Sequence, residues 1–158
     1  MHFVINFIKA KPEIDKEYNL VYQPGQILIG QHRERFWSAL DSWSVKDYAK
    51  QWIDGLKRIK SHDISCLIIN YIGIPEDPSL LVWAIFREGN RLFFENRALF
   101  NWKDKQIFKK PFVSKNCYEY IEPRSIYTNP ASKCDVYSTK YIAEEVDALI
   151  ESLQRVPL

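Results

Sequence analysis

The segment that begins at Trp43 most constrains the fold, because it carries every local signal of an amphipathic helix. Ser44 and Asp47 have the spacing of a capping box, in which the serine side chain accepts a backbone N–H and the acidic side chain reaches back. Trp43 and Tyr48 occupy the positions of a hydrophobic staple around that start. Apolar residues then recur at helical spacing, so we expect a helix over about residues 45–60.

Most of the remaining pattern is that of strands, which are short and bounded by Gly, Pro and Asn. The run 64–72 is apolar enough to be a central strand. The runs 80–87 and 91–97 are expected to form a hairpin, because the Gly and Asn of Glu88-Gly89-Asn90 tolerate positive φ. Residues 9–15 are expected to form a turn. Weaker patterns predict further strands over residues 2–8, 18–22, 26–30, 117–121 and 135–138.

A second helical pattern follows near the end of the sequence. Thr139 is expected to cap a helix over about residues 140–154, whose apolar positions recur at helical spacing. Many strands with one early and one late helix predict an α+β fold, in which helices cover one face of a mainly antiparallel sheet. The chain has 158 residues and no linker or internal repeat, so we expect a single domain over residues 1–158.

Charge and composition limit the classes of function. The formal net charge is +2 and the sequence pI is about 8.4, too weakly basic to predict nucleic-acid binding from charge alone. The three cysteines lack paired spacing, and we expect free thiols in a reducing compartment. The first residues lack the features of an export signal, and no apolar run is as long as a membrane span. These features predict a cytoplasmic protein without membrane contact.

The sequence contains no catalytic or ligand-binding motif that we can identify. Zinc, calcium, phosphate-loop and nucleophile-elbow patterns are absent, which predicts no metal, no cofactor and no enzymatic activity. One alternative is a small hydrolase in which His32 acts as base and Arg35 stabilises a phosphorane. Cys117 or Cys134 as a nucleophile would need a base that the fold brings close.

Several aromatic and charged segments in a fixed order are more specific than any single motif. They are Trp43–Trp52 (W-S-V-x-D-Y-x-x-Q-W), Trp83–Asn90 (W-x-x-F-R-E-G-N), the aromatic run Leu92–Asn96, and Glu122–Arg124 with its Pro-Arg pair. Over about residues 36–150, the chain resembles the immunity proteins of bacterial contact-dependent growth inhibition. It departs from that family at Ser132-Lys133-Cys134, where the family often carries Ser-Glu-Trp.

The resemblance implies a protein that binds the toxic C-terminal domain of an exoprotein made by sibling cells, in a one-to-one complex and without turnover. Many such toxins are nucleases, including RNases, and a nuclease has a basic substrate cleft. Exposed acidic and aromatic residues on loops are therefore the predicted toxin contacts: Glu76, Asp77, Glu88, Trp102, Asp104 and Glu119. Nucleic acid is not an expected partner. The alternative is a nucleic-acid-binding or regulatory module that uses the basic and aromatic segment 100–110.

Overall fold

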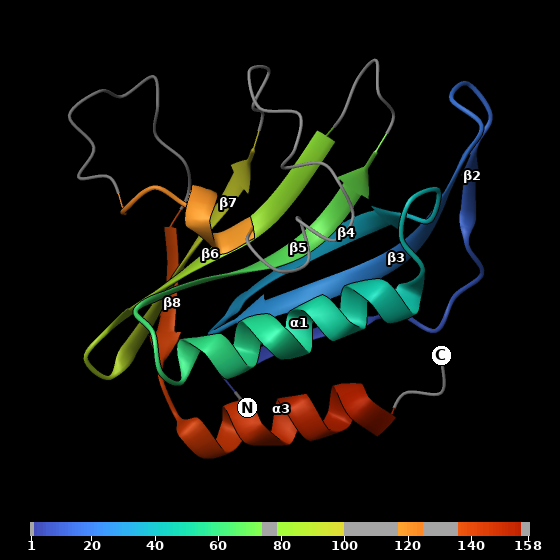
Figure 1. The fold of residues 1–158 in the computed structure, drawn as a ribbon. Helices are drawn as coiled ribbons and strands as arrows, with labels where there is room; N and C mark the ends of the chain where they lie inside the picture. The colour runs from blue at the N-terminus through green and yellow to red at the C-terminus, as the bar shows by residue number, and fades with distance from the viewer. Residues whose placement is uncertain (1, 74–78, 100–116, 125–135, 156–158) are drawn as a thin grey trace.

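The computed structural model describes residues 2–73, 79–99, 117–124 and 136–155. Within these ranges the chain forms two four-stranded antiparallel sheets and two α-helices (Figure 1). Sheet A contains β1 (Phe3–Phe7), β2 (Glu13–Asp15), β3 (Leu20–Ile29) and β4 (His32–Ala39). Sheet B contains β5 (Ile64–Ile72), β6 (Ser79–Glu88), β7 (Arg91–Ala98) and β8 (Val136–Lys140). The helical elements are α1 (Val45–Ile59), the short 3-10 helix η2 (Cys117–Tyr120) and α3 (Ala143–Arg155).

Strand β3 organises sheet A, because it pairs with β4 along one side and with β1 and β2 in succession along the other. Sheet B has the order β5-β6-β7-β8. The sheets meet where the Ala39 N–H of β4 donates to the Asn70 Oδ1 of β5 at 2.9 Å. Helices α1 and α3 lie side by side beneath the sheets in Figure 1, and an ion pair between Lys60 and Asp147 joins the ends of this helical layer.

Aromatic side chains from both sheets and from α1 build the core. The Phe3 ring of β1 lies 4.8 Å from the Phe94 ring of β7, which joins the inner faces of the two sheets. Trp52 of α1 is fully buried and lies 4.7 Å from Phe7 and 5.8 Å from Phe36, measured between ring centroids. The apolar face of α1 therefore packs against sheet A. Trp52 also contacts sheet B, where its indole N–H donates to the Ile68 carbonyl of β5.

The strongest sequence predictions are confirmed. Helix α1 begins at the predicted capping box, in which the Ser44 Oγ accepts the Asp47 N–H at 3.2 Å and the Asp47 Oδ2 accepts the Ser44 N–H at 2.9 Å. Trp43 and Tyr48 form the predicted staple, with ring centroids 5.1 Å apart. The α+β class, the strand over residues 64–72 and the hairpin of β6 and β7 are also confirmed.

The N-terminal sheet differs from its prediction. The predicted strands over residues 18–22 and 26–30 are one strand, β3, which continues through Pro24. Proline is tolerated there because β1 pairs with β3 only from Gly25 onward and β2 only up to Tyr22, so the missing N–H falls between two partner strands. The predicted turn over residues 9–15 instead contains β2.

The predicted antiparallel β-structure is confirmed and is divided into two sheets, since β4 and β5 are joined through side chains. Two further predictions in the rest of the chain are wrong. The segment expected to form a strand over residues 117–121 instead forms the 3-10 helix η2, which is followed by the buried Ile121. Thr139 does not cap the last helix, because it is buried in β8 and pairs with Leu92.

A close helix–strand contact at Gly55 gives a first testable prediction. A Cβ atom on Gly55 would lie 2.4 Å from the Cys66 carbonyl oxygen, which belongs to the backbone of β5. Gly55→Ala is therefore expected to destabilise the protein by about 1–3 kcal/mol through overpacking, despite the roughly 1 kcal/mol gained in helix propensity. Urea denaturation measures the change. The neighbouring exposed Asp54→Ala is the control and should shift stability by no more than about 0.5 kcal/mol; equal stabilities of the two variants would contradict the contact.

Candidate interaction surface

The first motif segment, Trp43–Trp52, closes the free edge of β5. Gln51 substitutes for a neighbouring strand: its Nε2 donates to the Cys66 carbonyl at 3.0 Å, and its Oε1 accepts the Ile68 N–H at 2.7 Å. The Trp52 indole N–H donates to the Ile68 carbonyl at 2.7 Å. These side chains are buried and satisfy backbone groups that would otherwise be unpaired at the edge of sheet B.

Tyr48 of the same segment joins the two sheets. Its hydroxyl donates to the Ala39 carbonyl of β4 at 2.8 Å and accepts the Tyr71 N–H of β5 at 2.9 Å. Burial raises the pKa of Tyr48 well above its ordinary value, so the hydroxyl remains a donor at neutral pH. The motif residues on α1 thus have structural roles, because they hold the helix and the two sheets together.

The second motif segment, Trp83–Asn90, has a similar role at the other end of α1. The Arg87 guanidinium donates to the Lys60 carbonyl at 2.9 Å and lies 4.2 Å above the centre of the Tyr141 ring. Arg87 therefore caps the C-terminal end of the helix. Gly89 has φ +60°, as the turn of the hairpin requires.

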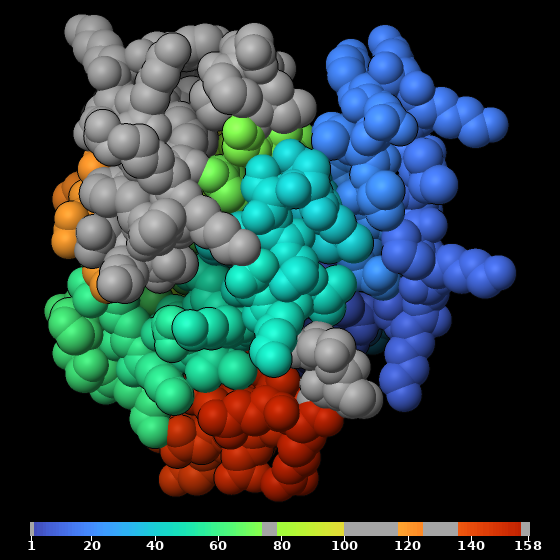
Figure 2. Space-filling model, turned by 45° about the vertical axis from the view of Figure 1, so that its right-hand side comes forward, coloured from blue at the N-terminus to red at the C-terminus, as the bar shows by residue number. Residues whose placement is uncertain are grey.

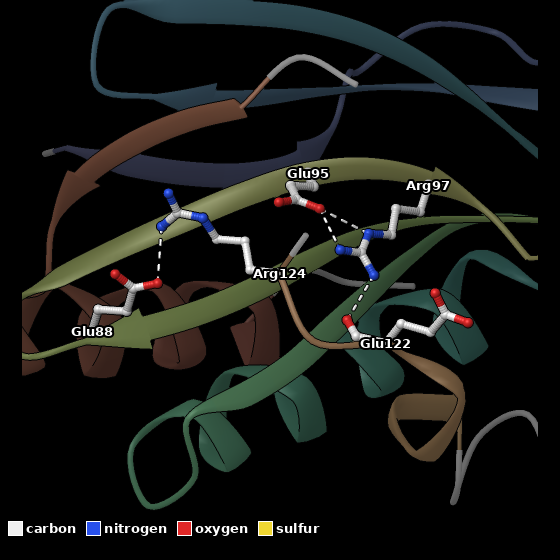
Figure 3. A network of polar contacts seen from close by, with 5 residues as sticks. All are labelled: Glu88, Glu95, Arg97, Glu122 and Arg124. Carbon is white, nitrogen blue, oxygen red and sulfur yellow. Dashed lines mark hydrogen bonds and ion pairs between the residues drawn. The ribbon is translucent and has the colours of Figure 1, made fainter. Parts of the chain in front are cut away.

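The later motif segments meet on the outer face of sheet B (Figure 3). Arg124 of the Pro-Arg pair forms an ion pair with Glu88 at 2.9 Å and lies 3.9 Å above the centre of the Phe93 ring. On the same face, Arg97 contacts the fully buried Glu95 through both Nε and Nη2, and its Nη1 donates to the Glu122 carbonyl at 2.8 Å. Segments far apart in the sequence are therefore fixed together by one polar network.

Two of the predicted toxin contacts fall on described residues. Glu88 is exposed at the end of β6, where it pairs with Arg124. Glu119 is exposed on η2, next to Tyr118, whose ring lies 3.7 Å from the Arg58 guanidinium. The other predicted contacts, and the segment 100–110 of the nucleic-acid-binding alternative, lie outside the described residues: Glu76, Asp77, Trp102 and Asp104.

The structure does not bring together the two residues of the alternative hydrolase site, His32 and Arg35. His32 pairs with Ile29 on the inner face of sheet A and stacks on Tyr137, with ring centroids 3.5 Å apart. Arg35 is an odd number of positions further along β4, so its side chain lies on the opposite face, where it is exposed. The proposed base and the proposed phosphorane partner therefore face away from each other.

The alternative in which a cysteine acts as nucleophile is not supported either, because no general base contacts Cys117 within the described residues. Cys117 is buried with its Sγ 3.2 Å from the Sγ of Cys66 and 3.8 Å from the Gln51 Nε2. The hydrogen bond with Cys117, together with burial, raises the pKa of the Cys66 thiol. Cys66 is therefore a protonated core residue. Cys134 lies outside the described ranges, within which no group of His, Cys, Asp and Glu side chains has the arrangement of a metal site.

The most exposed apolar surface was not predicted from the sequence. The large hydrophobic residues that are most exposed in the described ranges all lie on β2, β3, their connecting turn and β4. With the flanking Glu13 and Tyr22 they form what we call the hairpin surface: Glu13, Ile14, Tyr18, Val21, Tyr22 and Trp37. An open depression of about 320 Å³ lies in this surface and is lined by Glu13, Ile14, Asp15, Tyr22 and Trp37.

Comparison with known proteins places this fold in a family. A sequence model of the CdiI N-terminal domain matches residues 38–143. The chain therefore belongs to the CdiI family, the immunity proteins that its motif segments resemble. No curated protein matches the chain.

A solved structure shares the whole fold. It is a chain of the CdiA-CT/CdiI toxin and immunity complex from Enterobacter cloacae, which is 22% identical in sequence. The match has a TM-score of 0.76 and covers 98% of this chain and 99% of that chain. As to membranes, neither α-helix in the described ranges has the length and apolar character needed to cross a bilayer.

Proposed function

We propose that this chain binds the toxic C-terminal domain of a contact-dependent growth inhibition exoprotein and neutralises it in a one-to-one complex. The match of the CdiI N-terminal domain to residues 38–143 carries this proposal. The likeness to a chain of a toxin and immunity complex supports it. The engagement of the motif residues in the scaffold also supports inhibition by binding, without turnover. We further propose that the complex forms in the cytoplasm and needs no cofactor.

The toxin that we propose is a nuclease. A nuclease holds a polyanion in a basic cleft, and an inhibitor that presents carboxylates can occupy such a cleft. Glu88 and Glu119 remain proposed contacts, since both are exposed. They are carboxylates at the end of β6 and on η2, two elements that lie away from the β2–β3 hairpin in Figure 1.

Growth rescue tests the proposed function. The C-terminal domain encoded by the reading frame immediately upstream is expressed inducibly, with and without this chain. We expect the domain alone to arrest growth and degrade cellular RNA or DNA, and co-expression to restore growth. The two proteins should co-purify with equal stoichiometry. A harmless upstream domain, or arrest that persists without complex formation, would contradict immunity; arrest without nucleic-acid degradation would contradict only the nuclease assignment.

A further inference from the structure

The hairpin of β2 and β3 exposes large apolar side chains that a folded protein ordinarily buries. Ile14 and Tyr18 are each 66% exposed, Trp37 is 43% exposed and Val21 is 38% exposed. Ile14 and Val21 are cross-strand partners, so their side chains lie on one face of the hairpin. Adjacent exposed apolar side chains such as this pair, next to an exposed tyrosine on the connecting turn, mark an interaction site more often than scattered single residues do.

The hairpin also projects from the body of the protein. In Figure 1, β2 and its turn extend at the right of the molecule, away from α1 and α3, and Figure 2 shows this part of the chain as a blue lobe at the upper right. Buried Leu20 anchors the start of β3 in the body. On the opposite face from Ile14, the Trp37 indole N–H donates to the Glu13 carboxylate at 3.1 Å, which links β2 to β4.

The turn fixes the backbone at Tyr18. The Asp15 Oδ1 accepts the Glu17 N–H at 2.9 Å and the Tyr18 N–H at 3.2 Å, as in an Asx turn. Asn19 completes the turn with φ +52°, a conformation that asparagine tolerates better than most residues. A residue presented on an ordered turn loses little backbone entropy when it binds, which favours affinity.

The charge of the hairpin indicates the chemistry of its partner. Residues 13–22 contain three carboxylates and one lysine. Partial burial, and after it the fields of Asp15 and Asp41, raise the pKa of Tyr22. The hairpin therefore combines aromatic and aliphatic anchors with a negative potential, which is complementary to a basic surface.

We propose that the hairpin surface is the principal docking site for the toxin domain, with Tyr18 and Ile14 inserted into an apolar recess of its basic nucleic-acid cleft. The inference rests on the proposed function and adds the position of the interface and the chemistry of the surface it contacts. A nuclease whose basic cleft is filled by an acidic, aromatic hairpin cannot bind its polyanionic substrate.

The affinity of purified complexes tests this position. Toxin with its catalytic residue inactivated is titrated with wild-type protein and with the double variant Ile14→Ala/Tyr18→Ala. We expect the double variant to raise the Kd by roughly 30-fold or more, the loss that interface hot spots produce. Both side chains are mostly exposed, so the thermal unfolding temperature should not change. Lys57→Ala/Glu144→Ala, at exposed positions of α1 and α3, is the matched control and should retain wild-type affinity.

A charge variant tests the basic partner separately. Glu17→Lys reverses a charge of the turn whose side chain forms no hydrogen bond or ion pair with the other described residues. It should slow association with the toxin about 10-fold or more at low salt, an effect that added salt removes. Unchanged association at low salt would overturn the proposed electrostatic complementarity.

The outcomes separate this inference from the proposed function. If the wild-type protein neutralises the toxin but Ile14→Ala/Tyr18→Ala binds it equally well, the docking site is elsewhere and the inference is overturned. The same holds if only Glu88→Ala/Glu119→Ala weakens the complex. The wild-type protein could also form a dimer without toxin. If Ile14→Ala/Tyr18→Ala makes that dimer monomeric and leaves the toxin affinity unchanged, the surface binds a second copy of this chain. Failure of the wild-type protein to bind any toxin would contradict the proposed function itself.

Discussion

Replacement of Trp52 by alanine is expected to lower the free energy of unfolding by about 3–5 kcal/mol, the range measured for large aromatic residues in cores. The side chain is fully buried and contacts the rings of Phe7 and Phe36. Its removal opens a cavity between α1 and sheet A, and it also leaves the Ile68 carbonyl of β5 without its indole donor. Equilibrium denaturation in urea, followed by far-UV circular dichroism, measures the loss.

Two controls separate the contributions to this loss. Trp52→Phe keeps an aromatic ring but removes the indole N–H, and should cost about 1–3 kcal/mol for the unpaired buried carbonyl and the reduced volume. Trp37→Ala removes the same side chain from a 43% exposed position and should cost less than about 1 kcal/mol. Equal losses for Trp52→Ala and Trp37→Ala would show that the contacts of α1 with the sheets do not stabilise the protein.

The second large effect is expected at the buried ion pair of β7. Arg97→Met should destabilise the protein by about 3–5 kcal/mol, because it leaves the buried carboxylate of Glu95 without this cation. Glu95 is fully buried, and the Arg97 side chain is only 15% exposed, so solvent screens the pair weakly. The Arg97 contact with the Glu122 carbonyl and its position over the Phe86 ring would be lost as well.

A double variant identifies the cause of that loss. Glu95→Gln/Arg97→Met removes both charges and should be at least about 1 kcal/mol more stable than Arg97→Met alone, since no charge then remains buried. Urea denaturation of the wild type, Glu95→Gln, Arg97→Met and the double variant gives the double-mutant cycle. A double variant less stable than Arg97→Met would indicate that the loss of packing, and not the buried charge of Glu95, dominates.

The parts of the fold that could be predicted have local determinants. Helix α1 begins at a capping box and a staple that lie within a few residues of one another, and its apolar stripe repeats along the same segment. The hairpin of β6 and β7 likewise depends on a turn at Gly89. Interactions within such short windows are visible in the sequence as spacing.

The rest depends on contacts between distant segments. The continuity of β3 through Pro24 requires β1 and β2 to end on either side of it, and nothing near Pro24 in the sequence shows that. Thr139 has the chemistry of a helix cap, but pairing with Leu92 places it in a strand. In each case tertiary contacts override a local preference.

The hairpin surface had only a partial signal in the sequence. Ile14 stands in a polar segment, and such an isolated apolar residue is as compatible with a turn as with an interaction site. Its exposure depends on where β2 pairs with β3, which only the fold determines. Spacing predicted the structural partners of the motif residues, such as Trp43 with Tyr48, but did not predict that Glu88 pairs with Arg124.

The hydrogen bonds from Gln51 to β5 have a consequence for the behaviour of the protein at high concentration. A strand edge with unpaired N–H and carbonyl groups is a template for pairing with another chain, and therefore for aggregation. Gln51 and Trp52 occupy that edge with groups that cannot be extended into a further strand. The same helix that completes the core thus protects the β5 edge of sheet B from pairing with another chain.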